Sequence, residues 1–174
     1  NLDIGDTRAL FKAGRCGLLV EWGDPGPLQL DDDATAIKGK LYAISALGSR
    51  EVLNRATGEL VPVNIVNAPH AIDGINYAPF AAFGGWAGAV NKGADQKTKD
   101  AAYAFLSYMN QSAQSSVDVT IGATGYNPYR LSQLSSPDLF VKAGMPQALA
   151  ENYIGAINGA LNSLNMASDM KLSL

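Results

Sequence analysis

Two stretches of the chain have the hydrophobic spacing of amphipathic helices. Between Gln96 and Met109, apolar side chains recur at steps of three and four residues, and charged side chains cluster near the start. Between Gln147 and Leu164, a second apolar stripe is formed by Leu149, Tyr153, Ile154, Ile157 and Leu161. Gly155 and Gly159 lower the helix propensity of this second stretch, so packing against the rest of the protein must stabilise it.

The N-terminal pattern predicts a short helix followed by a buried strand. We expect the helix from Thr7 to Ala13, with Asp6 as its cap and Gly14 as its end. The continuous apolar run Cys16–Val20 is typical of a strand buried on both faces. Two further strands are predicted at Lys40–Ala46 and Trp86–Val90.

A β-hairpin is predicted between residues 51 and 63. Glu51–Leu53 and Leu60–Val63 flank the polar loop Asn54–Glu59, which is typical of two strands joined by a turn. Pro62 has no backbone N–H, so it keeps the second strand at a sheet edge. Residues 67–83 show little periodicity and are interpreted as a crossing segment. The mixture of helices and strands indicates the α/β class.

The composition is that of a folded, mildly acidic domain. Hydrophobic residues make up 47% of the 174 residues and charged residues 17%, which argues against a disordered chain. Lys and Arg number 13 against 16 Asp and Glu, whereas nucleic-acid binders normally carry a basic surplus. This acidic balance predicts that nucleic acid is not a partner. No apolar run approaches the roughly 18 residues that span a bilayer, and the first residues lack the basic and apolar regions of a signal peptide.

Few residues are suited to catalysis or metal binding. The single cysteine, Cys16, excludes an internal disulfide, and its apolar neighbours predict a free, buried thiol. No pattern pairs the single histidine, His70, with a nucleophile. Gly84–Gly88 precede a predicted strand, unlike a phosphate-binding loop, and Asp31–Asp33 lack calcium-loop spacing and are interpreted as solvated. We therefore expect no enzymatic activity, no cofactor and no metal.

Aromatic and polar side chains gather at the ends of the predicted elements. The candidate ligand-binding residues are Glu21, Trp22, Asp24, Trp86, Tyr126 and Arg130. Open α/β sheets bind ligands beyond the carboxyl ends of their strands. A tryptophan face can stack on a sugar ring, and carboxylates and arginines can bind the hydroxyls. The pattern therefore indicates a sugar-like ligand, and the alternative that it leaves open is that both tryptophans pack in a core or hinge.

Three segments resemble one known family. Phe11–Asp24 resembles the helix–glycine–strand–tryptophan segment of extracellular solute-binding proteins of family 1, the maltose-binding-like receptors of ABC importers. Phe83–Gly93 is similar to the glycine-glycine-tryptophan strand of that family, and Asp100–Met109 to its alanine-x-x-phenylalanine-leucine helix. The segments occur in the family's order, and the stretch that they span, residues 11–109, makes up most of the chain.

The resemblance implies an α/β fold that is part of a two-lobed periplasmic-binding-protein type II architecture. In this fold, two lobes close on a ligand across a hinge. Residues 1–79 would then belong to the second lobe, residues 80–134 would cross into the first lobe, and residues 135–174 would return to the second. Trp22 and Trp86 match the positions of ligand-stacking aromatics, and Tyr126 and Arg130 match a turn close to the cleft.

The resemblance also implies that much of the first lobe lies outside this chain. Family members are much longer, so we expect a missing N-terminal portion or a partner chain. Ser49–Pro69 is unlike compact bacterial versions and resembles an insertion found in sensor regions of large eukaryotic membrane proteins, including receptor-type cyclases. Asn110–Ser112 is an N-glycosylation sequon, which suits such a setting. We expect an extracellular or periplasmic location.

The leading hypothesis is non-catalytic binding of a small extracellular solute, a carbohydrate, by lobe closure for an ABC importer or a membrane receptor. The alternative is a structural or protein-interaction module that keeps the fold without binding a ligand. A hydrolase or transferase is disfavoured, because no nucleophile–base pair is visible. Phe105, Leu106 and Met109 should form an apolar face that packs on elements of the first lobe.

Overall fold

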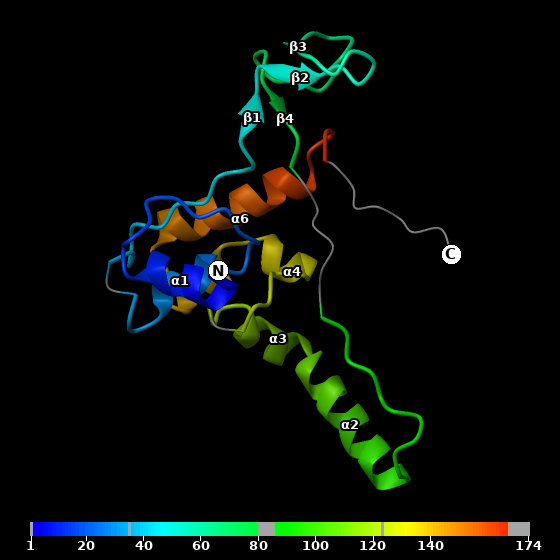
Figure 1. The fold of residues 1–174 in the computed structure, drawn as a ribbon. Helices are drawn as coiled ribbons and strands as arrows, with labels where there is room; N and C mark the ends of the chain where they lie inside the picture. The colour runs from blue at the N-terminus through cyan, green and yellow to red at the C-terminus, as the bar shows by residue number, and fades with distance from the viewer. Residues whose placement is uncertain (1, 35, 80–85, 123, 167–174) are drawn as a thin grey trace. The chain divides into compact units, whose positions relative to one another are not determined.

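The chain folds into two compact units. The computed structural model describes residues 2–34, 36–79, 86–122 and 124–166 (Figure 1). Unit 1 comprises Asn1–Tyr42 and Gly84–Glu151, and unit 2 comprises Ala43–Phe83 and Asn152–Leu174. Each unit is therefore built from two separate stretches of sequence.

Unit 1 is built from helices and irregular segments. Its helices are α1 (Ile4–Lys12), the 3₁₀ helix η1 (Gly26–Leu30), α2 (Gln96–Met109), α3 (Ser112–Asp118), α4 (Leu131–Leu134), α5 (Asp138–Lys142) and the start of α6 (Gln147–Leu161). The prediction for α2 is confirmed at both ends, and α6 stops three residues before the predicted Leu164. Among the described residues, no helix has both the length and the apolar character needed to cross a membrane.

Helix α1 begins at a capping box. The Asp3 carboxylate accepts a hydrogen bond from Asp6 N at 2.9 Å, and the Asp6 carboxylate accepts one from Asp3 N at 3.2 Å. The cap is therefore Asp3 and not the predicted Asp6, because Asp6 already lies within the first turn. Gly14, with a φ of 70°, follows the end of the helix as predicted, since glycine adopts this left-handed conformation without strain.

A small apolar core lies within the first stretch of unit 1, and a glycine of the second stretch packs against the same region. The core consists of Leu28, Ala34 and Ile37, with Phe11 and Leu41 packed against it. Gly122, from the second stretch, lies directly on the backbone of η1. A Cβ atom at this position would come within 2.7 Å of Leu28 Cα, so any larger residue would push the two stretches apart.

Unit 2 contains two short antiparallel ladders. β1 (Gly48–Ser49) pairs with β4 (Asn76–Tyr77), and β2 (Glu51–Leu53) pairs with β3 (Leu60–Pro62). The second ladder confirms the predicted hairpin, which extends beyond β1 and β4 in Figure 1. Because this ladder has two strands, Pro62 lies on an edge, as predicted.

Two asparagine side chains connect the two stretches of unit 2. Asn152 of α6 accepts a hydrogen bond from Ala43 N at 2.8 Å and donates one to Ala43 O at 3.0 Å, as the backbone of a neighbouring strand would. Asn165 donates to Asn76 Oδ1 at 2.6 Å and to Tyr77 O at 2.7 Å. These bonds fix the end of α6 and the residues after it within unit 2.

The three strands predicted outside the hairpin are wrong. Cys16–Val20, Lys40–Ala46 and Trp86–Val90 form no ladder with any residue that the structure describes. A strand is stable when a neighbouring strand takes up its backbone N–H and C=O groups, and the described part of the chain pairs no strand with these segments; the Asn152 side chain bonds to Ala43 alone. Leu18 is consequently 63% exposed and Val20 88% exposed, instead of buried. Cys16 is free, as predicted, but exposed, so the prediction of a buried thiol is also wrong.

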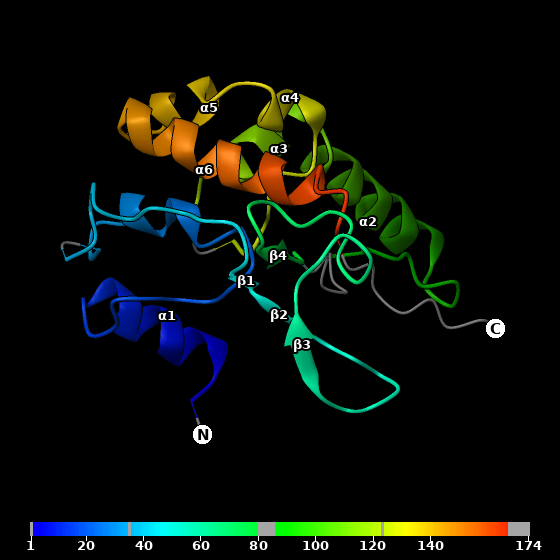
Figure 2. The same ribbon diagram turned by 90° about the horizontal axis from the view of Figure 1, so that it is seen from above.

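Residues 86–109, which we call the α2 arm, combine an extended segment with a helix. The extended segment runs back along α2 (Figure 1; Figure 2). Gly88 touches Leu106 so closely that a Cβ atom would lie 2.2 Å from Leu106 Cδ2. No residue of α2 is buried, and Phe105 is 62% exposed while Met109 is half-buried. The predicted apolar face therefore exists, and its partner stays a prediction.

Candidate functional site

Arg8 of α1 forms ion pairs with two of the candidate carboxylates. Arg8 Nε lies 3.2 Å from Glu21 Oε2, and Arg8 Nη1 lies 2.8 Å from Asp24 Oδ2. The Asp24 side chain is 3% exposed, and nothing else among the described residues bonds to its Oδ2, so Arg8 compensates this buried charge. Arg8, Glu21 and Asp24 are called the Arg8 cluster below.

The Arg8 cluster carries a fixed positive charge between two carboxylates. Burial alone would lower the pKa of Arg8, but its hydrogen bond to Glu21 and the charge of Asp24 raise that pKa overall. Glu21 Oε1 also accepts a hydrogen bond from Trp22 N at 3.1 Å, which orients the backbone at the tryptophan. The cluster therefore has a formal net charge of one negative unit, and it lies directly beside Trp22.

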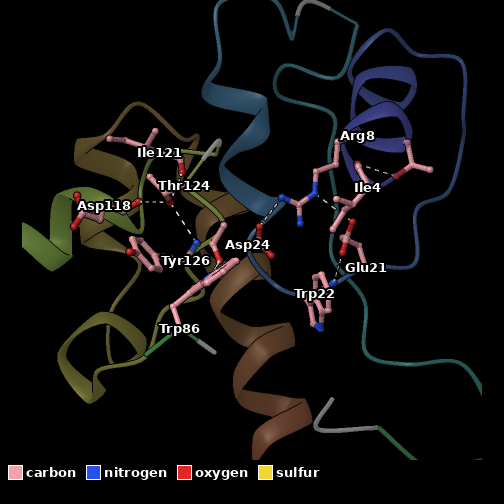
Figure 3. A network of polar contacts seen from close by, with 12 residues as sticks. Ile4, Arg8, Glu21, Trp22, Asp24, Trp86, Asp118, Ile121, Thr124 and Tyr126 are labelled. Atoms are coloured by element: carbon pink, nitrogen blue, oxygen red, sulfur yellow. Dashed lines mark hydrogen bonds and ion pairs between the residues drawn. The ribbon is translucent and has the colours of Figure 1, made fainter. Parts of the chain in front are cut away.

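Trp86 reaches the same part of unit 1 from a distant position in the sequence. Its Nε1 donates a hydrogen bond to Gly125 O at 3.3 Å. Gly125 lies between Trp86 and the Arg8 cluster, since a Cβ atom placed on it would be 3.9 Å from Trp86 Nε1 and 4.0 Å from Asp24 Oδ2. In the view of Figure 3, Asp24 is drawn between Trp86 and Trp22. Unit 1 therefore brings both tryptophans close to the same carboxylate cluster.

Both indole rings are open to solvent. Trp22 is 51% exposed and Trp86 is 78% exposed. Tyr126, which follows Gly125, is half-buried, and its backbone N–H donates to Thr124 Oγ1 at 3.3 Å. Neither tryptophan is therefore buried in a core of the described residues, and the alternative that they pack at a hinge stays a prediction. Exposed aromatic side chains that gather around polar groups are typical of interaction sites.

Arg130 is engaged in a different set of contacts. Its Nε donates to Ser115 Oγ at 3.0 Å, and its Nη2 donates to the carbonyl oxygen of Asn110. Gln133 Oε1 accepts hydrogen bonds from Tyr129 N at 3.0 Å and from Arg130 N at 3.1 Å. Within the described ranges, Arg130 shares no interaction with the Arg8 cluster. Its donors instead tie α4 to α3 and to the end of α2.

Sequence reasoning missed Arg8, Ser115 and Gln133. Arg8 carried a usable signal, because two acidic residues next to an apolar run need a nearby cation and α1 precedes that run. Ser115 and Gln133 are buried, yet they carried no such signal. Both are common polar residue types, and their burial depends on tertiary contacts that spacing does not encode.

A second ion-pair cluster joins α1 to the acidic loop. Lys12 Nζ lies 3.2 Å from Asp31 Oδ2 and 2.6 Å from Asp33 Oδ1. The hydrogen bond from Lys12 holds the pKa of Asp33 below its ordinary value and raises that of Lys12. Asp32 and Asp33 are exposed, so the prediction of a solvated loop is confirmed for them. Among the described residues, no group of three or more His, Cys, Asp or Glu side chains is arranged to hold a metal ion.

Unit 2 contains a hollow of about 630 Å³ that is a second candidate site. Its described lining consists of Ser45, Pro69, His70, Ala71, Ile72, Tyr77, Pro79, Gly159, Asn162, Ser163, Leu164 and Asn165. None of the six candidate residues belongs to this lining. It offers the phenol ring of Tyr77 and the imidazole of His70, but no indole ring and no carboxylate. The tryptophans beside the Arg8 cluster are therefore better suited to bind a sugar than this hollow.

No protein-family model, curated protein or solved structure matches the chain. The resemblance to family 1 solute-binding proteins and the lobe boundaries that it implies therefore stay predictions. The function has to be inferred from the chemistry of the site.

Proposed function

We propose that this protein binds a small, neutral, sugar-like solute outside the cell without transforming it chemically. The observation that carries the proposal is the exposure of Trp22 and Trp86 beside the Arg8 cluster. Exposed indole faces can stack on the C–H face of a sugar ring, and nearby carboxylates can accept hydrogen bonds from its hydroxyls. Sites for small ligands typically combine such apolar surfaces with a few fixed polar groups.

Each residue of the site has a distinct role in this proposal. Trp22 and Trp86 supply the stacking faces, and Tyr126 borders them. Glu21, whose side chain is 11% exposed, accepts a hydrogen bond from a sugar hydroxyl. Arg8 uses Nε and Nη1 within the cluster, and in this proposal its Nη2 donates to a second hydroxyl.

The remaining candidates, Asp24 and Arg130, stabilise the site without contacting the ligand. Asp24 is buried and orients Arg8 without reaching the ligand. Arg130, whose donors bind Ser115 and Asn110, stabilises the neighbouring helices and does not touch the ligand. These roles depart from the sequence-based expectation, which grouped Asp24 and Arg130 with the hydroxyl-binding residues.

In the same proposal, the chain is one part of a two-lobed receptor of the family 1 solute-binding type. The first lobe comes from a further portion of the polypeptide or from a partner chain. Closure of the lobes passes the binding signal to an ABC importer or a membrane receptor. The open face of the α2 arm and the unpaired segment 16–20 support this view, because both leave apolar groups that a partner element would cover.

A thermal-shift titration tests the proposal. Maltose and a panel of other neutral mono- and disaccharides are added to the protein, with glycerol as the control. A ligand that binds the native state alone stabilises it by about 2.7 kcal/mol at one hundred times its Kd, so the unfolding midpoint should rise and then follow the logarithm of concentration. Glucuronate should shift the midpoint less than glucose, because the Arg8 cluster repels an anion. Unchanged midpoints with every neutral sugar would contradict the proposal.

The second candidate is a protein-interaction module that binds no small solute. It is favoured by the α2 arm, in which Phe105 is 62% exposed and no helical residue is buried. This candidate gives the opposite result in the same experiment, because no sugar would then protect the protein from heat. The panel of sugars therefore separates the two functions.

A further inference from the structure

The turn between α2 and α3 carries a motif that solute binding does not use. Asn110, Gln111 and Ser112 form an asparagine-x-serine sequon whose middle residue is not proline. All three residues are exposed. At no other position of the 174 residues is an asparagine followed two residues later by serine or threonine. The motif therefore defines a single site.

The backbone of Asn110 is held in place while its side chain faces solvent. Asn110 N donates to Leu106 O at 3.1 Å, and the carbonyl oxygen of Asn110 accepts a hydrogen bond from Arg130. The side-chain Nδ2 donates to Leu106 O at 2.9 Å and carries a second hydrogen. Replacing that second hydrogen by a sugar leaves the bond to Leu106 intact, so the folded turn accommodates the modification.

A sugar on Asn110 would lie on the side of α2 that carries Leu106 and away from Phe105. Asn110 follows Leu106 by four residues and Tyr103 by seven, so these three positions share one side of the helix. Phe105 and Tyr108 lie on the opposite side, where Ala101 precedes them at the same spacing. A glycan at the end of α2 is therefore compatible with a partner that packs on Phe105.

We propose that Asn110 is a site of N-glycosylation. Asn110 Nδ2 forms a bond to C1 of the first sugar, and the bond from C1 to the pyrophosphate of a lipid-linked oligosaccharide breaks. The lipid pyrophosphate leaves with the electron pair of that bond, and the amide releases one proton. The inference rests on the proposed extracellular location, and it adds a covalent modification that solute binding does not require.

The test is secretion of the full chain from a eukaryotic cell behind a cleavable leader. Intact mass is measured before and after treatment with peptide-N-glycosidase, which removes the glycan and converts Asn110 to aspartate. We expect a heavier protein whose mass falls on treatment, with the aspartate located at residue 110. Ser112→Ala should abolish the added mass while leaving Asn110 and its contacts unchanged, and Ser112→Thr should retain it. Ser116→Ala, also in α3, is the matched control and should retain it as well.

Two results would overturn the inference. One is a secreted wild-type chain with an unmodified Asn110, and the other is a glycan that persists in Ser112→Ala. If the unmodified chain still binds maltose, the inference about Asn110 fails and the proposed function stands. If a glycosylated chain responds to no sugar, the proposed function fails and the modification stands.

Discussion

Helices α6 and α2 are nearly equal in length and equally visible in the sequence, yet their surroundings in the structure are opposite. α6 has 15 residues and α2 has 14. The buried residues of α6 are Leu149, Ala150, Tyr153 and Ile154, whereas α2 has no buried residue. An apolar stripe therefore predicts where a helix forms, but it does not tell whether the surface that covers the stripe belongs to the same chain.

The two helices differ in the neighbours that the described chain provides. The Asn152 side chain of α6 makes two hydrogen bonds to the backbone of Ala43, one to its N–H and one to its C=O. In the α2 arm, the segment before the helix contacts Leu106 through Gly88. Phe105 stays exposed to solvent. This difference supports the proposal that α2 packs on elements outside this chain.

The largest expected effect comes from truncating one side chain in each helix. Ile154→Ala removes a side chain that is 5% exposed and should cost about 2–5 kcal/mol of unfolding free energy. Phe105→Ala should change that free energy by less than about 0.5 kcal/mol, because the ring is 62% exposed. Denaturant unfolding measures both. An equal loss of unfolding free energy in the two variants would mean that Phe105 is covered in the isolated chain, which would contradict the difference between α6 and α2.

Arg130→Ala should release the α2 arm from the rest of unit 1. The guanidinium bonds to Ser115 and to the carbonyl of Asn110, and hydrogen bonds to a charged group contribute about 1.5–3 kcal/mol. Amide hydrogen exchange should accelerate in α2 and α3 but not in β2 and β3. Arg55→Ala, in the hairpin loop, is the matched control and should leave α2 unchanged. Normal protection of α2 in Arg130→Ala would show that Arg130 does not hold the arm.

The start of α2 should weaken in acid. Asp95 accepts hydrogen bonds from Thr98 N at 3.0 Å and Thr98 Oγ1 at 2.8 Å, and these bonds hold the pKa of Asp95 below its ordinary value of 3.8. Because the folded pKa is depressed, the stabilisation is fully present above that ordinary value. It is lost as the pH falls through the folded pKa.

Asp95→Asn separates charge from capping at this position. Asparagine keeps the capping oxygen but does not titrate, so the variant should lack the acid-dependent loss of Thr98 amide protection. Asp95→Ala should fray the first turn at every pH. NMR-detected amide exchange over an acid series measures all three proteins. Identical acid profiles for wild type and Asp95→Asn would contradict the role assigned to the carboxylate.

The smallest expected effect concerns Cys16, which, like the residues of α2, is not buried. Its thiol is free and exposed, so a bulky thiol reagent should label the native protein nearly as fast as the unfolded protein. Cys16→Ser is the control that should take up no label. Strong protection of the native thiol would mean that the segment 16–20 is covered, as the sequence pattern alone predicted.

The sequence predicted local structure better than tertiary surroundings. The bounds of α2 and the hairpin of β2 and β3 follow from spacing and turn residues, which act over a few positions. The buried strand at Cys16–Val20 was wrong because burial of a strand needs neighbours, and apolar spacing carries no information on whether they exist. Trp22 and Trp86 were chosen because they adjoin the predicted strands Cys16–Val20 and Trp86–Val90. The structure does not form these strands, so the ligand-binding role of both tryptophans stays a prediction. Glu21 and Asp24 indicated that a cation lies nearby, but only the fold shows that this cation is Arg8.

The affinity and stability of Trp86→Ala, measured together, test the central claim most directly. Maltose is titrated into wild type and variant by calorimetry, with Trp22→Ala in parallel, and each protein is unfolded by denaturant. Loss of a stacking face should weaken binding by about 1–3 kcal/mol, or roughly 5- to 150-fold, while unfolding free energy changes by less than about 0.5 kcal/mol, because the ring is 78% exposed. Unchanged affinity with a stability loss of about 3–5 kcal/mol, the cost of removing a buried tryptophan, would contradict the claim.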